Sequence, residues 1–152
     1  MALFVGILPR IIATFGIALA VILTAVASSR GANMIGKAAA ALISEHPERF
    51  GQSLVLQMMS ASQGLYGFII GFLIFLNMGE GLTLQASMNY FFAGLIMGVA
   101  GYLTCIQQSA AATAGVQILA KKPEHSTKGL LYSAMIETYA IFTFVIAIML
   151  VL

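Results

Sequence analysis

Four long apolar stretches constrain the fold of this chain more than any other feature of its sequence. They cover approximately Ile11–Ser28, Leu54–Met78, Tyr90–Ala114 and Leu130–Leu152. Each reaches or approaches the roughly 20 residues that an α-helix needs to cross a bilayer. Apolar residues occur all round each stretch rather than along one stripe, which is typical of membrane helices. We therefore predict an all-α membrane protein with four transmembrane helices, forming a single membrane domain over residues 1–152.

The composition argues against most soluble functions. Charged residues make up 8% of the 152 residues, whereas soluble domains carry roughly 25%. The net charge is +2, and the few basic residues form no patch interleaved with aromatic side chains, so we expect no nucleic-acid partner. Cys105 is the single cysteine, which excludes a disulfide framework. A chain of this length has no room for a soluble catalytic domain, and we expect no enzymatic activity of its own.

The basic residues predict the orientation in the membrane. Six of the seven flank the first and third connections between the apolar stretches: Arg30, Lys37, Arg49, Lys121, Lys122 and Lys128. The middle connection, Asn77–Asn89, has none, and Arg10 lies on its side. Both charged connections are therefore expected on the cytoplasmic side of the cell membrane, with both termini outside. Arg10, the first stretch and Ala25-Val26-Ala27 also resemble a signal peptide, but the internal repeat requires this helix.

An internal repeat divides the chain into two halves, roughly residues 1–76 and 77–152. A shift of 76 residues superimposes the halves without a gap, so that Pro47-Glu48 falls on Pro123-Glu124 and Leu54 on Leu130. Each half consists of a helix, a polar turn and a second helix. Because each hairpin starts and ends on the same side of the membrane, the repeat is parallel, unlike the inverted repeats of many secondary transporters. We predict two parallel-repeated helical hairpins.

Two pairs of glycines have the spacing that allows close packing of membrane helices. Gly67 and Gly71 form one pair, and Gly94 and Gly98 form the other. This spacing is common in membrane proteins, and we interpret both pairs as ordinary helix packing.

Glu137 is a lone carboxylate inside the fourth apolar stretch, well away from either end. The other acidic residues lie in the polar segments between stretches. A charged group at such depth costs about 2.5–3.5 kcal/mol on insertion scales and usually marks an ion or proton path. Neutralisation by Na⁺ or by a proton would remove most of this desolvation penalty. Glu137 therefore predicts ion translocation.

Three neutral polar side chains accompany this carboxylate in the apolar stretches. Ser62 and Gln63 lie in the second stretch and Gln108 in the third. Amide, hydroxyl and carboxylate oxygens are the hard ligands that suit a small hard cation. In the repeat, Glu137 falls opposite Ala61 and Gln108 opposite Ala32. The polar groups are thus divided between the hairpins, as if one site were assembled across both.

Three motifs carry a resemblance to a known family: Gln63-Gly64-Leu65-Tyr66-Gly67-Phe68, Ile118-Leu119-Ala120-Lys121-Lys122-Pro123-Glu124-His125 and Ile136-Glu137-Thr138-Tyr139-Ala140-Ile141. The chain resembles the duplicated proteolipid (the K or c subunit) of V-type and A-type rotary ATPases, most of all the bacterial Na⁺-translocating K subunits. The resemblance implies a ring of identical four-helix subunits that acts as a rotor, each subunit having one ion site at membrane mid-depth. Na⁺ is the implied ion, with H⁺ as the alternative.

The resemblance also implies the roles of individual residues. The essential carboxylate is Glu137, and the other ion ligands are Gln63, Gln108, Ser62 and the backbone carbonyl of Met59, while Tyr66 hydrogen-bonds the carboxylate. The implied partners are further copies of the chain, lipid, a stator membrane subunit with a basic residue, and soluble central-stalk subunits. The stalk is expected to contact the turn residues Glu48, Arg49, Glu124 and Lys128.

One segment departs from the family pattern. The family commonly has Leu-Pro-Gly-Thr-Gln-Gly where this chain has Met59-Ser60-Ala61-Ser62-Gln63-Gly64. Serine in place of threonine keeps the hydroxyl oxygen. Proline would disrupt the helical hydrogen bonds and free carbonyls for an ion, so its absence argues against a backbone ligand at Met59.

Two other classes of function compete with the rotor. A small dimeric proton-coupled exporter also combines four helices with one membrane glutamate, although the parallel repeat and the charged turns argue against it. A proteolipid that only organises the membrane would leave Glu137 and its polar companions unexplained.

Overall fold

The computed structural model describes residues 2–152, and this part of the chain forms helices and no strand. The elements are α1 (Ala2–Glu45), α2 (Phe50–Met58), α3 (Ser62–Asn77), α4 (Leu84–Lys121) and α5 (Ser126–Val151), with single 3₁₀ turns at Pro47–Arg49 and Pro123–His125. Four stretches are long and apolar enough to cross a membrane: Gly6–Glu45, Pro47–Asn77, Leu84–Lys121 and Pro123–Val151. The predicted all-α membrane fold with four spans is confirmed.

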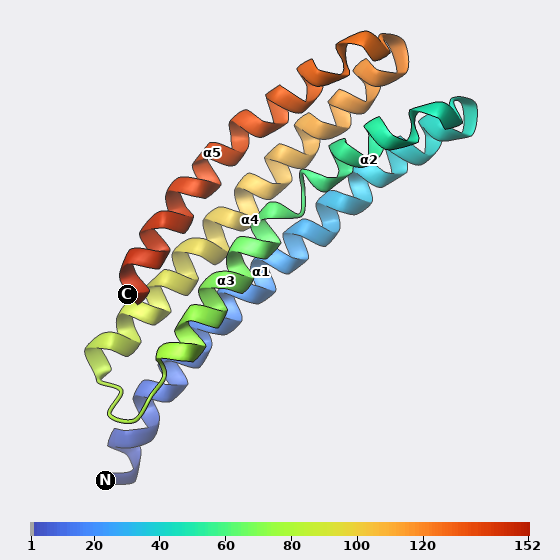
Figure 1. The fold of residues 1–152 in the computed structure, drawn as a ribbon. Coiled ribbons are helices and arrows are strands. Elements are labelled where there is room, and N and C mark those ends of the chain that lie inside the picture. Colours follow the sequence, from blue (N-terminus) through green and yellow to red (C-terminus); the bar gives the residue numbers. More distant parts are fainter. Residues whose placement is uncertain (1) are drawn as a thin grey trace.

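The helices pack as two hairpins side by side. α1 and α4 make the most extensive contact, α3 lies mainly against α1, and α5 lies mainly against α4 (Figure 1). The first hairpin is therefore α1 with α2 and α3, and the second is α4 with α5. Both 3₁₀ turns lie at one end of the bundle, here called the turn end. The loop at 78–83 lies at the opposite end, here called the loop end (Figure 1).

The helices continue beyond the predicted apolar stretches on the turn side. α1 ends at Glu45 and α4 at Lys121, and the prolines Pro47 and Pro123 each begin a 3₁₀ turn. Proline suits this position because its φ is fixed and its missing N–H would have no helical acceptor. α4 also begins earlier than predicted, at Leu84, where the side chain of Thr83 accepts a hydrogen bond from the N–H of Ala86 (3.1 Å).

Arg30 does not flank the first connection as predicted. It lies inside α1, about 22 Å before the end of the helix at 1.5 Å per residue. Its Nη1 donates to the hydroxyl of Tyr102 on α4 at 2.6 Å. Arg10 lies near the loop end, where its Nη2 donates to the carbonyl of Gly79 at 3.4 Å. The orientation in the membrane stays a prediction that now depends mainly on the basic residues at the turn end.

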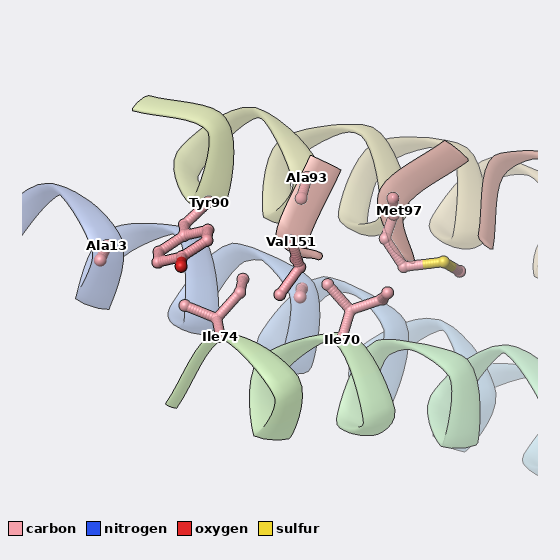
Figure 2. Packing of buried hydrophobic residues seen from close by; sticks show 9 residues of the cluster. Ala13, Ile70, Ile74, Tyr90, Ala93, Met97 and Val151 are labelled. Atoms are coloured by element: carbon pink, nitrogen blue, oxygen red, sulfur yellow. The ribbon is translucent and has the colours of Figure 1, made fainter. Parts of the chain in front are cut away.

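The interior has two apolar clusters. One lies toward the loop end and the other toward the turn end. In Figure 2, Ile70 and Ile74 of α3 point toward Val151 of α5 and Tyr90 of α4. The second cluster joins α1, α2 and α4: Ile35, Leu42, Leu56, Ala112, Val116 and Leu119. Between the clusters lie polar side chains that are at most 1% exposed: Thr24, Ser60, Gln63, Gln108, Ser109 and Ser133. A buried polar layer thus crosses the middle of the bundle.

The two predicted glycine pairs pack against α1, as expected. A Cβ at Gly71 of α3 would lie 2.7 Å from the side chain of Val21, and one at Gly98 of α4 would lie 2.5 Å from the carbonyl of Leu19. Neither position has room for a side chain. These close approaches bring α3 and α4 to adjacent faces of one helix, where they also contact each other, and so bring the polar residues of both hairpins together.

Candidate ion-binding site

The site forms where the second span is interrupted. α2 ends at Met58 and α3 begins at Ser62. In the intervening residues the backbone N–H groups bond only three residues back, as from Ala61 to the carbonyl of Met58 (3.0 Å). The N–H of Gly64 donates instead to Ser28 Oγ on α1 at 2.9 Å. Within residues 2–152, no backbone N–H bonds the carbonyls of Met59 and Ser60.

This interruption overturns the expectation based on the missing proline. The prediction gave one helix over Leu54–Met78 and argued against a freed carbonyl at Met59. The helix breaks without proline because the hydroxyl of Ser28 replaces the backbone acceptor of Gly64. Met59 O lies 3.4 Å from Ser62 Oγ, whose single proton has a nearer acceptor in Gln63 Oε1 at 3.2 Å. A backbone carbonyl is therefore available beside the predicted polar residues.

The predicted side chains form one hydrogen-bonded chain that ends at the carboxylate. Ser62 Oγ donates to Gln63 Oε1 at 3.2 Å, and Gln63 Nε2 donates to Gln108 Oε1. Gln108 Nε2 donates to Glu137 Oε2 at 3.4 Å. The hydroxyl of Tyr66 donates to the other carboxylate oxygen at 2.8 Å. The structure thus brings together every residue that the sequence analysis assigned to the site, from α3, α4 and α5 and, for Met59, from the interruption before α3.

No basic side chain within residues 2–152 forms an ion pair with Glu137. Gln63 and Gln108 are fully buried, whereas Glu137 is partly exposed near the middle of α5. The ion pairs found among the described residues involve only the first turn, where His46 and Arg49 approach Glu48. A carboxylate held by neutral donors at membrane depth needs a proton or a bound cation to offset its desolvation. The site can therefore take up one positive charge and release it at the surface of the bundle.

Two further residues support this arrangement and were not assigned to the site from the sequence. Ser133 Oγ on α5 donates to the backbone carbonyl of Gln108 at 3.1 Å. The ring of Phe144 stacks on that of Tyr66, with centroids 4.8 Å apart. The repeat points to Ser133, because the shift of 76 places it opposite Gln57, so that both hairpins have a polar residue at this position of an apolar helix.

The first hairpin repeats the supporting contact without the site. Gln57 Nε2 donates to the carbonyl of Ala32 at 3.2 Å, and these two residues are the counterparts of Ser133 and Gln108. The counterpart of Glu137 is Ala61. The scaffold is thus present twice, whereas the carboxylate is present once.

Comparisons with known proteins identify the family. The family model for the C subunit of ATP synthase matches two stretches, residues 15–74 and 91–150. The chain belongs to this family. The two matches begin 76 residues apart and end 76 residues apart, which is the offset of the internal repeat. The exact division of the domain at residues 76 and 77 stays a prediction.

Two curated relatives in this family extend over most of the chain. The V-type sodium ATPase subunit K of Enterococcus hirae is 48% identical over 142 residues, which cover 93% of this chain and 91% of that protein. The A-type ATP synthase subunit K of Methanocaldococcus jannaschii is 35% identical over 142 residues, which cover 93% of this chain and 62% of that protein. The predicted resemblance to V-type and A-type proteolipids is confirmed, and the chain is a multi-pass membrane protein.

Proposed function

We propose that this chain is the rotor-ring subunit of a rotary V-type ATPase and that it carries Na⁺ across the cell membrane on Glu137. The observation that carries this proposal is the chain of hydrogen bonds from Ser62 through both glutamines to the carboxylate. The similarity to a sodium ATPase subunit supports the same ion. ATP hydrolysis or synthesis would belong to soluble partner subunits, and this chain performs no catalysis itself.

The donor set favours Na⁺ over H⁺. A proton on Glu137 needs only the carboxylate and one acceptor in an apolar pocket. The site instead gathers oxygens from Ser62, Gln63, Gln108 and the freed carbonyl of Met59. An amide group can present its oxygen or its nitrogen after a half-turn, so Gln108 can offer Oε1 to a cation. Together with the carboxylate these atoms would form a hard oxygen cage of the kind that a dehydrated Na⁺ requires.

Rotation would follow from loading and unloading this cage. In a ring of identical subunits, each Glu137 faces lipid or a neighbouring subunit while it holds the ion, and Tyr66 fixes its orientation. A stator subunit with a basic residue would displace the ion at one half-channel and allow reloading at the next. Each ion that crosses 100 mV transfers about 2.3 kcal/mol, which several ions per turn would couple to ATP chemistry.

The turn end would face the cytoplasm and the central stalk. Glu48, Glu124 and Lys128 are exposed there, where soluble subunits would contact them. Arg49, which we also predicted as a stalk contact, donates instead to the carbonyls of Leu119 and Ala120 within the chain. We therefore assign Arg49 to the contact between the hairpins.

Labelling with dicyclohexylcarbodiimide tests the proposed ion, because this reagent attacks protonated buried carboxyl groups. Glu137 should be labelled in the purified ring, and millimolar Na⁺ should suppress the labelling while K⁺ should not. Labelling that depends on pH alone and ignores Na⁺ would assign the same rotor to H⁺. The mass of the detergent-purified assembly tests the rotor itself, since a ring supports it and a dimer supports a proton-coupled exporter.

A further inference from the structure

A groove opens on the second hairpin at the turn end. It lies between α4 and α5 and encloses about 630 Å³. Its apolar wall includes Ile118 and Tyr132, and its polar rim carries His125 with three lysines, Lys121, Lys122 and Lys128. The side chain of Tyr132 is largely exposed in this groove. A single chain therefore leaves an apolar surface with a basic rim uncovered.

The repeat identifies what normally covers such a surface. A shift of 76 residues relates Ile118, His125 and Tyr132 to Leu42, Arg49 and Leu56 of the first hairpin. In the first hairpin this surface is covered, because Leu42 is 7% exposed and Leu56 is 2% exposed. Both leucines pack with Val116 and Leu119 of α4. The apolar wall of the groove is thus the uncovered counterpart of a surface that the second hairpin covers within the chain.

Arg49 defines the polar part of the covered interface. Its Nη1 donates to the carbonyl of Leu119 at 3.0 Å and to that of Ala120 at 2.7 Å. These carbonyls belong to the last turn of α4, where backbone acceptors lack helical donors and a cation is favourable. The shift of 76 relates them to the carbonyls of Ile43 and Ser44. Those two residues lie in the last turn of α1, and Ser44 is exposed.

We infer that the last turns of α1 from the next copy fill this groove, and that His125 donates to the carbonyl of Ile43 or Ser44 of that copy. This inference rests on the proposed ring. A heterologous interface repeats the same contact from copy to copy and closes when the rotation allows. The contact between the two hairpins of one chain then recurs between chains, with His125 in the place of Arg49.

The charges of the two surfaces are complementary. The end of α1 and the turn that follows it carry Glu45 and Glu48, whereas the groove carries three lysines. The acidic turn of one copy would therefore lie beside the basic groove of the next. The reverse pairing, groove against groove, would bring six lysines together at a cost in free energy. This charge pattern favours head-to-tail assembly, in which the second hairpin of one copy packs on the first hairpin of the next.

Cross-linking tests the interface directly. All variants carry Cys105→Ser, which removes the buried natural thiol and leaves only the introduced cysteines. The introduced pair is His125→Cys with Ser44→Cys. A short bifunctional thiol reagent is preferable to oxidation, because a disulfide tolerates a Cα separation of only about 4.4–6.8 Å. We expect a ladder of dimers, trimers and larger species in denaturing gels. The matched control, Arg49→Cys with Ala120→Cys, should link within one chain and give no ladder.

The possible failures are distinguishable. A ring of normal mass without a ladder overturns the interface while the proposed rotor stands. If that ring also retains an anionic phospholipid that Lys121→Ala with Lys122→Ala releases, the groove holds lipid instead of protein. A particle with the mass of one or two chains contradicts the proposed rotor itself.

A gain of stability gives a second test that does not depend on cross-linking. His125→Arg restores the two-donor geometry of Arg49, so the ring should dissociate in detergent at a higher temperature than the natural ring. His125→Ala should dissociate at a lower temperature. Glu124→Ala, an exposed neighbour in the same turn, should leave the temperature unchanged. The inference is wrong if His125→Arg and Glu124→Ala behave alike.

Discussion

The two hairpins share a scaffold and differ in chemistry. Each has a long first helix, a 3₁₀ turn that begins with proline, and a polar side chain that bonds a carbonyl of the first helix at the same repeat position. Only the second hairpin carries a carboxylate in its span, and its α5 is unbroken. The corresponding span of the first hairpin is interrupted between Met58 and Ser62. The charge and the freed carbonyl therefore come from different copies of one ancestral pattern.

This difference shows how a duplicated scaffold can build one site. The unbroken helix holds Glu137 at mid-span, while the broken helix supplies Ser62, Gln63 and the carbonyl of Met59. Gln108 on α4 joins the two halves, since it bonds both Gln63 and Glu137. The four spans consequently share one carboxylate at mid-span, Glu137. In the proposed ring each pair of hairpins therefore carries one ion, and the first hairpin contributes ligands without a carboxylate.

The largest effect should come from Glu137→Gln. The glutamine keeps the size and one acceptor oxygen but cannot cycle through a charged form, so ion-coupled ATPase activity should disappear while the ring assembles. Adding Ala61→Glu to this variant places a carboxylate at the counterpart position, where Ala32 stands in place of Gln108. We expect no recovery of transport in vesicles. Recovery would mean that the hairpins are interchangeable and that the polar companions are dispensable.

The sequence predicted those features that depend on composition and spacing. The four spans, the repeat and the candidate residues Ser62, Gln63, Gln108 and Glu137 follow from apolar runs that a few polar residues interrupt, whereas Tyr66 and Met59 came from the family resemblance. The interruption of the second span did not follow, because it depends on Ser28, which lies far away in the sequence and competes for the N–H of Gly64. The depth of Arg30 was also missed, because α1 continues through a polar segment that favoured a connection. Both the interruption of the second span and the position of Arg30 depend on contacts between residues that are far apart in the sequence.

The second largest effect should come from Gln108→Ala. This amide both accepts from Gln63 and donates to Glu137, so its removal divides the hydrogen-bonded chain. Hydrogen bonds to charged groups contribute about 1.5–3 kcal/mol, or roughly 10- to 100-fold in affinity. The Na⁺ concentration that half-protects Glu137 from dicyclohexylcarbodiimide should rise by that factor. The control is Gln107→Ala, which removes the exposed amide one residue earlier in α4 and should leave the protection unchanged.

A smaller effect is expected for Tyr66→Phe. The variant loses the hydrogen bond to Glu137 but keeps the stacking on Phe144. Tyr66 lies at the end of the hydrogen-bonded chain, so the amide bridge survives, and we expect a rise of about tenfold or less in the half-protecting Na⁺ concentration. Tyr139→Phe, which alters an exposed phenol on α5, is the matched control. Equal effects of the two variants would remove Tyr66 from the site.

The smallest effect is expected at a contact that both hairpins contain. Ser133→Ala removes the hydrogen bond to the carbonyl of Gln108, and Gln57→Ala removes the equivalent bond to the carbonyl of Ala32. Such bonds between membrane helices contribute about 0.6 kcal/mol, so both variants should lower the temperature at which the ring dissociates by a few degrees. Only Ser133→Ala should also raise the half-protecting Na⁺ concentration, by about threefold for the same 0.6 kcal/mol, because Gln108 has a side chain that reaches Glu137 and its counterpart Ala32 does not. A similar shift for Gln57→Ala would mean that the scaffold of the first hairpin tunes the ion site, and that the division of roles between the hairpins is wrong.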